Sequence, residues 1–557
     1  AKTATRVVLP ATARRYSAAS GSGVMPGTCN GWAAGNGCPS LVARARGMAF
    51  RAGPTWVGSD TSAQDSANPN PAAWHCARPM PGRCSSSGLH GNIATTCAPA
   101  GRASRQFNAG WQAAVRLSTR ANPAVCRRHI RELSARPRDN SAMQDKTTSQ
   151  APGALSGVRV LDLSRVLAGP WCTQTLADLG ADVIKVERPG SGDDTRAWGP
   201  PYLKDADGHD TSEAAYFLGA NRNKRSLAVD LSKPAGQAVV RKLAGQVDVL
   251  VENFKVGDLA RYGLDAHSLL AEHPGLVICS ITGFGQTGPY AERAGYDYAI
   301  QGMGGLMSVT GERDDLPGGG PQKVGVAVAD LFTGLYATVA ILAALRHRDA
   351  TGQGQIIDMA LLDTQLAMLA NLGSNYLCSG KVPGRMGNAH QNIVPYQTFE
   401  ASDGHLILAV GNDRQFTKFC EIAGRPAWAI DPRFATNAER VRHRAVLVPL
   451  LEDVIRQRPR ADWLASLEAA KVPCGSINSI AEAFADPQAQ FRGAIVPMSH
   501  PLAPELRLVA SPMKLSATPV QYRHAPPLLG QHSDELLREA GCTEQEITNW
   551  RESGVIA

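Results

Sequence analysis

Paired cysteines and membrane-length apolar runs are scarce in this 557-residue chain. The 12 cysteines include no zinc-type CxxC pair, and those after residue 140 are scattered singly, as is typical of a reducing compartment. The longest uncharged apolar run, residues 331–345, is shorter than the about 20 residues that cross a bilayer, so we expect a buried core helix and no membrane partner. No secretory pattern opens the chain, and we expect a cytoplasmic protein.

Three common catalytic motifs are also missing after residue 140. There is no GxxxxGK(S/T) loop, no HExxH and no GxSxG, which argues against nucleotide hydrolysis, zinc proteolysis and serine hydrolysis. With neither HExxH nor CxxC, the sequence predicts no metal site. Cys172, Cys279 and Cys474 have no nearby histidine in the sequence, so we interpret them as structural thiols.

Acidic residues and lysine are rare in the first 140 residues, which hold 17 Arg and one Lys against four acidic residues. The leader thus has a surplus of 14 positive charges, and the overall +8 leaves −6 (8 − 14) for the rest. Because the leader lacks a periodic apolar pattern, we do not expect nucleic acid as a partner. We expect residues 1–142 to lie outside the working protein, and residues 1–152 to form a leader and linker. The alternative is a transit peptide, which would place the protein in the mitochondrial matrix.

Strand and helix patterns alternate from residue 157 onward. VRVLDL, ADVIKVE, SLAVDL, VDVLVENF and GLVICSITG have the apolar pattern of buried strands, and amphipathic helical segments separate them. This alternation predicts an α/β fold with a doubly wound parallel sheet in a large domain at 153–380. We interpret IIDMALLDTQLAMLANLGSNYL as another apolar helix. A linker loop and a smaller α+β domain are expected at 381–495, and a C-terminal return to the large domain at 496–557.

The segment GFGQTG matches the dinucleotide fingerprint GxGxxG through Gly283, Gly285 and Gly288. An NAD-dependent oxidoreductase is therefore one alternative. However, Pro289 interrupts the expected helix start, and no acidic residue follows at the usual spacing of about 20 positions.

A single carboxylate, Asp330, stands in the apolar stretch VGVAVADLFTGLYATVAILAALRHRDATGQGQ. Aspartate is a favoured N-cap, because its oxygens accept hydrogen bonds from the free amides of the first helical turn. The same position suits a nucleophile, which those amides and the helix dipole would hold ionised. The stretch alone leaves both interpretations open.

Seven motifs in order carry a resemblance to a known family: LSGVRVLDLSRVLAGP, LGADVIKVERPGSGDDTR, NRNKRSLAVDL, VENF, ITGFGQTGP, AGYDY and VAVADLFTGLYA. Together they resemble the class III coenzyme A transferases, and RVLAGP, GDDTRAWGPP, AGYD, GNAHQNIVPYQTF and PPLLGQH are most similar to the succinate–hydroxymethylglutarate CoA-transferases. The resemblance implies an interlocked homodimer, CoA thioesters as substrates and no permanently bound cofactor. It also implies that Asp330 is the nucleophile and forms an aspartyl-CoA thioester.

The resemblance further implies a set of CoA contacts. They are Val166, Arg188, Val229, Asp230, Leu231, Ser232, Asn253, Phe254 and Arg261. Two positions depart from the formyl-CoA transferases, which have Gln at the place of Leu167 and Lys at that of Ala294. These departures argue against formate as the acyl group.

Of all the features considered, the substrates are the ones that the sequence specifies least. We expect succinyl-CoA or a similar dicarboxyl-CoA as donor, and glutarate, hydroxymethylglutarate or itaconate as acceptor. The far carboxylate needs a cation or donors, because burying it unpaired costs several kcal/mol. The candidates are Arg165, Arg385 and His390. An α-methylacyl-CoA racemase is the alternative within this superfamily, but it needs the histidine of AGHD where this chain has Tyr296.

Overall fold

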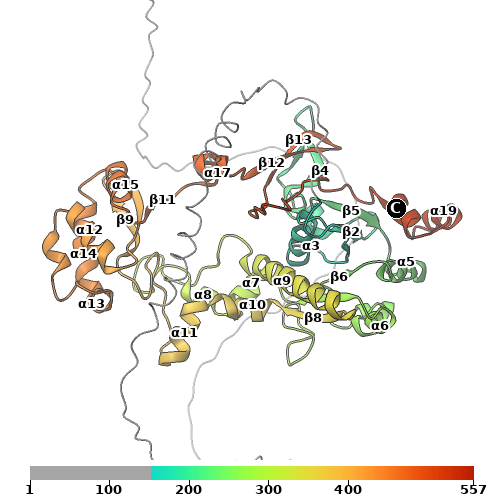
Figure 1. The fold of residues 1–557 in the computed structure, drawn as a ribbon, viewed down its shortest axis with the longest axis horizontal. Helices are drawn as coiled ribbons and strands as arrows, with labels where there is room; N and C mark the ends of the chain where they lie inside the picture. The colour runs from blue at the N-terminus through green and yellow to red at the C-terminus, as the bar shows by residue number, and fades with distance from the viewer. Residues whose placement is uncertain (1–151) are drawn as a thin grey trace, which may run out of the picture. The chain divides into compact units, whose positions relative to one another are not determined.

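The computed structural model describes residues 152–557 (Figure 1). The expectations about residues 1–142 therefore lie outside the described residues. A six-stranded, fully parallel sheet is the main feature of this part of the chain, in the order β5-β2-β1-β6-β7-β8. Its strands are β1 (Arg159–Asp162), β2 (Asp182–Glu187), β5 (Lys224–Ala228), β6 (Val249–Glu252), β7 (Val277–Thr282) and β8 (Gln355–Ala360).

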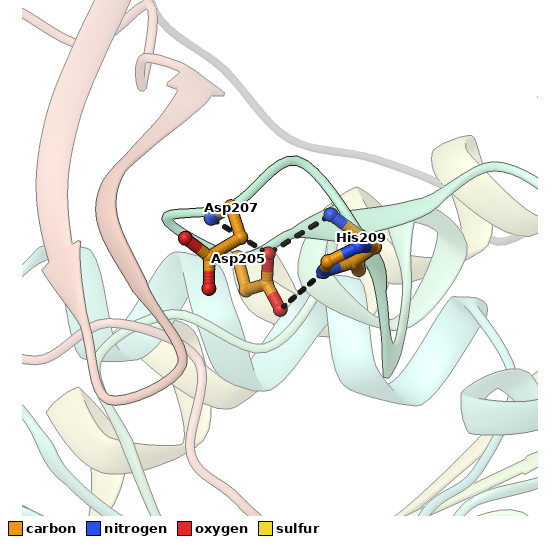
Figure 2. A group of neighbouring side chains, drawn as sticks. All are labelled: Asp205, Asp207 and His209. Carbon is orange, nitrogen blue, oxygen red and sulfur yellow. Dashed lines mark hydrogen bonds and ion pairs between the residues drawn. The ribbon is translucent and has the colours of Figure 1, made fainter.

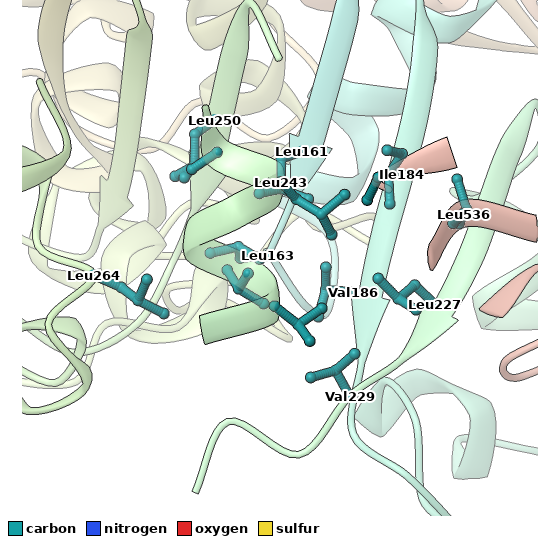
Figure 3. Close-up of a cluster of buried hydrophobic side chains, with 14 of the residues drawn as sticks. Leu161, Leu163, Ile184, Val186, Leu227, Val229, Leu243, Leu250, Leu264 and Leu536 are labelled. Carbon is teal, nitrogen blue, oxygen red and sulfur yellow. The ribbon is translucent and has the colours of Figure 1, made fainter. Parts of the chain in front are cut away.

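Both faces of this sheet are covered by apolar clusters. Successive side chains of a strand point to opposite sides, so neighbouring residues enter different clusters. Val160 and Val183 belong to one core cluster, whereas Leu161 and Ile184 belong to the other, which Figure 3 shows. The first cluster includes residues of α3 (Ala168–Asp178) and α9 (Val328–Thr351), and the second includes residues of α5 (Pro234–Ala244), α6 (Ala266–Glu272), α18 (Ser533–Glu539) and α19 (Glu544–Glu552). The predicted α/β fold with a large parallel sheet is confirmed.

One predicted helix is partly a strand. Residues 355–360 form β8, which pairs in parallel with β7 at the edge of the sheet, and helices begin only at Leu361. The β-branched Ile356 and Ile357 suit a pleated strand, and a short apolar run cannot be assigned to helix or strand by periodicity alone. The helices that follow are α10 (Leu361–Met368) and α11 (Ala370–Ser379).

Helix α9 is the one helix of residues 152–557 that is long and apolar enough to cross a membrane, with a mean hydropathy of 1.8 over an 18-residue window. The core helix of a soluble protein meets the same criteria. Ala337, Ile341 and Ala344 are buried in the cluster that covers one face of the sheet, as expected for a core helix. The absence of a membrane partner stays a prediction.

Residues 394–474 have their own apolar cluster around Phe416, Phe419 and Trp463. It is built by the antiparallel strands β9 (Tyr396–Ala401), β10 (Gly404–Ala409) and β11 (Cys474–Ser476) with helices α12 (Asp413–Ile422), α13 (Asn437–Arg442), α14 (Arg444–Ile455) and α15 (Arg460–Ala469). The hairpins β3–β4 (Tyr202–Lys204, Asp210–Ala214) and β12–β13 (Ile495–His500, Ala503–Val509) lie outside both sheets. The remaining segments are α4 (Ala215–Leu218), α7 (Asp297–Met303), α8 (Leu306–Val309), α16 (Ile480–Ala485), α17 (Pro487–Phe491), η1 (Asp194–Ala197), η2 (Leu259–Tyr262) and η3 (Pro426–Ala429). The proposed domain boundaries stay predictions.

Candidate active site

The strand order reverses between β1 and β6, and open α/β sheets bind ligands at the carboxyl ends of the strands at such a point. The turn after β1 and the turn after β6 are tied together there. The backbone N–H of Arg165 donates to Oδ1 of Asn253 at 2.9 Å, and Nδ2 of Asn253 donates to the Arg165 carbonyl at 2.7 Å. Asn253 therefore fixes the position of the first turn.

Val166, in this first turn, has a left-handed backbone with φ of 72°. A β-branched residue rarely adopts this conformation, so the surrounding structure must hold it. The backbone N–H of Val166 donates to the carboxylate of Asp193 at 3.2 Å. The buried Lys185 links that carboxylate to the turn, since its Nζ donates to Asp193 Oδ2 at 2.9 Å and to the Ser164 carbonyl at 3.0 Å.

A second buried ion pair lies beneath the same turn. Lys224 Nζ donates to Asp162 Oδ2 at 3.0 Å, and both side chains are fully buried. Burial lowers the pKa of Lys224 to about 8, although the charge of Asp162 opposes this effect. The Asp162 carboxylate also accepts from Thr173 at 2.7 Å and from Ser164. Both ion pairs therefore hydrogen-bond to Ser164 at the start of the turn and hold its backbone.

A cavity of about 370 Å³ opens at the carboxyl ends of β1, β2 and β5. Six of the nine residues predicted to contact CoA line it: Arg188, Val229, Asp230, Leu231, Ser232 and Phe254. Val166 and Asn253 line a neighbouring cavity. Arg261 lines neither; its side chain is 73% exposed and pairs with Asp258, which lines both. The binding of CoA by these residues stays a prediction.

The neighbouring cavity, of about 220 Å³, contains Asp330. It shares Arg165, Phe254 and Asp258 with the larger cavity. The two cavities therefore lie side by side.

Helix α9 begins at Val328 with Ala327 as N-cap, so Asp330 lies in the first turn and does not cap the helix. Asp297 takes that role, since its Oδ1 accepts from the backbone N–H of Ala329 at 2.8 Å and of Asp330 at 3.4 Å. Burial and the charge of Asp297 raise the pKa of Asp330 to about 7. The N-cap interpretation of Asp330 is therefore excluded, and the pKa of this carboxyl group is raised, whereas stabilisation by the first-turn amides would lower it.

Asp297 is a functional candidate that the sequence interpretation missed. Its second carboxylate oxygen accepts from Nε2 of the buried Gln301 at 2.7 Å, and Gln301 in turn accepts from the backbone N–H of Val324. This chain of bonds fixes the segment before α9 as well as the carboxylate beside Asp330. The adjacent Tyr296, at the racemase histidine position, lines the cavity and is 66% exposed.

The three candidates for a far carboxylate are in different surroundings. Arg165 lines both cavities and pairs with Asp194 at 3.0 Å. Arg385 pairs with Asp314, and His390 lies against the ring of Tyr396, with 5.2 Å between ring centroids. Neither Arg385 nor His390 lines the cavity of Asp330 within this chain. Their roles stay predictions.

The dinucleotide fingerprint lacks its structural context. Gly285 and Gly288 follow β7 with positive φ, but no helix begins until α7 at Asp297, so no helix N-terminus meets a pyrophosphate there. The nicotinamide alternative loses its support.

Outside the site, Asp205, Asp207 and His209 gather in the β3–β4 turn (Figure 2). Asp205 Oδ1 accepts from the backbone N–H groups of Asp207 and His209, each at 2.9 Å, which is the bonding of an Asx turn. This bonding explains the cluster as a turn that closes the hairpin.

Several known proteins resemble this chain. The model of CoA-transferase family III matches residues 155–533. A succinate–glutarate CoA-transferase of Agrobacterium fabrum is 52% identical over 406 residues, covering 73% of this chain and all of that protein. The succinyl-CoA:glutarate CoA-transferase of Homo sapiens is 42% identical, covering 69% of this chain and 85% of that protein. A crystal structure of a CAIB/BAIF family protein from Brucella suis, 51% identical, matches with a TM-score of 0.61 over 70% of this chain and all of that one. The chain therefore belongs to CoA-transferase family III, and it is a CoA-transferase.

Proposed function

We propose that this enzyme moves CoA from succinyl-CoA to glutarate or a similar dicarboxylate, with Asp330 as the nucleophile. The observation that carries the proposal is the position of Asp330 in a cavity that shares a wall with the larger cavity at the strand ends. The names of relatives at 52% and 42% identity support succinyl-CoA and glutarate as the substrate pair. Hydroxymethylglutarate and itaconate are the other acceptors we propose to test.

In the proposed reaction, the Asp330 carboxylate attacks the thioester carbonyl and the CoA thiolate leaves, which gives a mixed anhydride. The thiolate then attacks the aspartyl carbonyl, so succinate departs and an aspartyl-CoA thioester remains. The acceptor carboxylate attacks this thioester to form a second anhydride and releases the CoA thiolate. The thiolate then attacks the acceptor's carbonyl, which forms the new acyl-CoA and releases the Asp330 carboxylate. A carboxylate with a pKa near 7 is a stronger nucleophile than an ordinary aspartate and is still largely ionised near pH 8.

Covalent trapping tests the role of Asp330. The parent enzyme is incubated with succinyl-CoA and then with hydroxylamine or borohydride, and the peptide that contains residue 330 is analysed by mass spectrometry. A modified Asp330 is expected in the parent and none in Asp330→Asn. Turnover without any modification of this peptide would contradict the mechanism.

An acid panel tests the substrate class. Dicarboxylates are expected to exceed monocarboxylates of equal chain length in kcat/KM, with acyl-CoA products measured by mass spectrometry. Exchange of the α-proton of a 2-methylacyl-CoA in deuterated water, without an acceptor acid, would instead support the racemase.

We also propose a homodimer. Phe332, Leu335, Tyr336 and Val339 form an apolar stripe along α9, each between 43% and 63% exposed. Such a stripe at helical spacing is typical of a contact surface. Sedimentation at micromolar concentration is expected to show a dimer, and a monomer would contradict the proposal.

The cysteines support a location in a reducing compartment, which we propose is either the cytoplasm or the mitochondrial matrix. The six cysteines of residues 152–557 are all free thiols, among them Cys172 and Cys279. Fractionation of the source cells tests this location directly.

A further inference from the structure

The cavity of Asp330 contains three cations and three carboxylates, and their pairing is uneven. The cations are Arg165, Lys255 and Arg293, and the carboxylates are Asp194, Asp258 and Asp330. Asp194 pairs with Arg165, and Asp258 pairs with Arg261 outside the cavity.

Two of the cations have no such partner. Within residues 152–557, neither Arg293 nor Lys255 forms an ion pair or a hydrogen bond with a carboxylate. Both side chains line the same cavity as Asp330. The cavity that contains Asp330 therefore has two positive charges that no carboxylate of residues 152–557 neutralises.

Two aromatic rings orient the exposed side chain of Arg293. Its guanidinium lies 4.5 Å from the ring centroid of Tyr290 and 5.3 Å from that of Phe284, and the two rings pack edge to face at 5.5 Å. Such cation–π contacts orient a guanidinium without neutralising it.

The loop that carries Arg293 is closed at its base by two glycines. A Cβ on Gly283 would lie 2.5 Å from the Cα of Gly295, so only glycine allows this backbone contact. Lys255 has no comparable support and carries a flexible four-carbon stem.

We propose that Arg293 binds the far carboxylate of the acid that reacts at Asp330, and so determines the preference for dicarboxylates. The planar guanidinium offers paired N–H donors that match the two oxygens of a carboxylate, whereas the near carboxylate is left free to react. This assignment rests on the proposed dicarboxylate substrates. It gives Arg293 a role in binding and leaves the proposed reaction steps unchanged.

The test compares glutarate with pentanoate, a monocarboxylate of the same chain length, as acceptors. In a ping-pong reaction kcat/KM for the acceptor reports only the second half of the cycle, so the donor does not affect the comparison. Arg293→Met is expected to lower kcat/KM for glutarate about 10- to 100-fold, the effect of losing a charged hydrogen-bonding partner, and to leave pentanoate within about twofold. Arg293→Lys is expected to recover part of the loss.

Two control variants accompany it. Arg346→Met removes an exposed arginine from the same helix as Asp330, about 24 Å further along at 1.5 Å per residue, and is expected to leave both acids unchanged. Lys255→Met removes the other unpaired cation and is expected to weaken glutarate less than Arg293→Met does. Circular dichroism checks the fold, and Arg293→Gln replaces Arg293→Met if that variant does not fold.

The outcomes separate the two proposals. A parent enzyme that does not prefer glutarate refutes the dicarboxylate substrates, and this assignment with them. A parent preference that survives in Arg293→Met, or an equal loss for both acids, refutes the assignment alone. A selective loss confined to Lys255→Met overturns it in favour of the lysine.

Discussion

Replacement of Asp330 by Asn is expected to make the protein more stable while it abolishes CoA transfer. Burial and the neighbouring Asp297 raise the pKa of Asp330 to about 7, against an ordinary value of 3.8. Full expression of this difference corresponds to about 4 kcal/mol of lost stability above about pH 7. Since the side chain is partly exposed, solvent screening reduces the effect, and we expect a gain of about 1–3 kcal/mol.

The direction of the pKa shift determines how the stability difference between Asp330→Asn and the parent changes with pH. The folded parent holds the Asp330 proton more tightly than the unfolded chain does, so this proton stabilises the fold at low pH. That stability is lost as the pH rises from about 4 to about 7. Asn has no proton to lose, so the advantage of Asp330→Asn over the parent should grow between about pH 5.5 and pH 8.5, by about 1–2 kcal/mol.

Urea unfolding of both proteins at these two pH values measures the difference. Asp453→Asn is the matched control, because the Asp453 side chain is 75% exposed on α14, and its stability should stay within about 0.5 kcal/mol of the parent. If Asp330→Asn is no more stable than the parent near pH 8.5, or its advantage is the same at both pH values, the electrostatic account of this site is wrong.

Three further changes test other parts of the site. Asp297→Asn keeps an acceptor for the first turn of α9 but removes the charge beside Asp330, so the acidic limb of kcat/KM should move about one pH unit lower; an unchanged limb would deny the coupling. Lys224→Met leaves the charge of Asp162 buried without its partner and should cost about 3–5 kcal/mol in urea unfolding, whereas a neutral effect would show that the pair does not brace the fold. Arg188→Ala should raise KM for succinyl-CoA about tenfold but leave KM for a succinyl-pantetheine thioester unchanged, because only CoA carries phosphates; equal losses would remove Arg188 from the phosphate site.

The large sheet could be predicted because its strands are buried on both faces. Val160 and Leu161 enter opposite apolar clusters, so the strands are continuous apolar runs and are easily distinguished from the amphipathic helix α5 between them. β8 was missed because it is the edge strand and continues without a break into α10. Its Ile356 and Ile357 are only partly buried, so nothing in the local pattern marks the change from strand to helix.

The candidate nucleophile was found through the family resemblance, but its electrostatic state could not be read from the sequence. A carboxylate in the first turn of a helix is normally stabilised by the free amides. Here those amides are occupied by Asp297, which lies 33 residues earlier and reaches α9 only in the folded chain. The local rule therefore gave the wrong direction for the pKa of Asp330, which burial and the charge of Asp297 raise.

The cations of the cavity illustrate the same limit. Sequence reasoning selected Arg165, Arg385 and His390 because they lie in motifs near the expected acyl end of CoA. In the fold Arg165 and Arg385 have acidic partners, whereas Arg293, ten residues beyond the first glycine of GFGQTG, has none within residues 152–557. Which charge is free depends on how side chains from the turns after β1, β6 and β7 pair in the fold. Gly283, the first glycine of the supposed nucleotide fingerprint, thus has a different role: it packs against Gly295 at the base of the loop that places Arg293 in the cavity of Asp330.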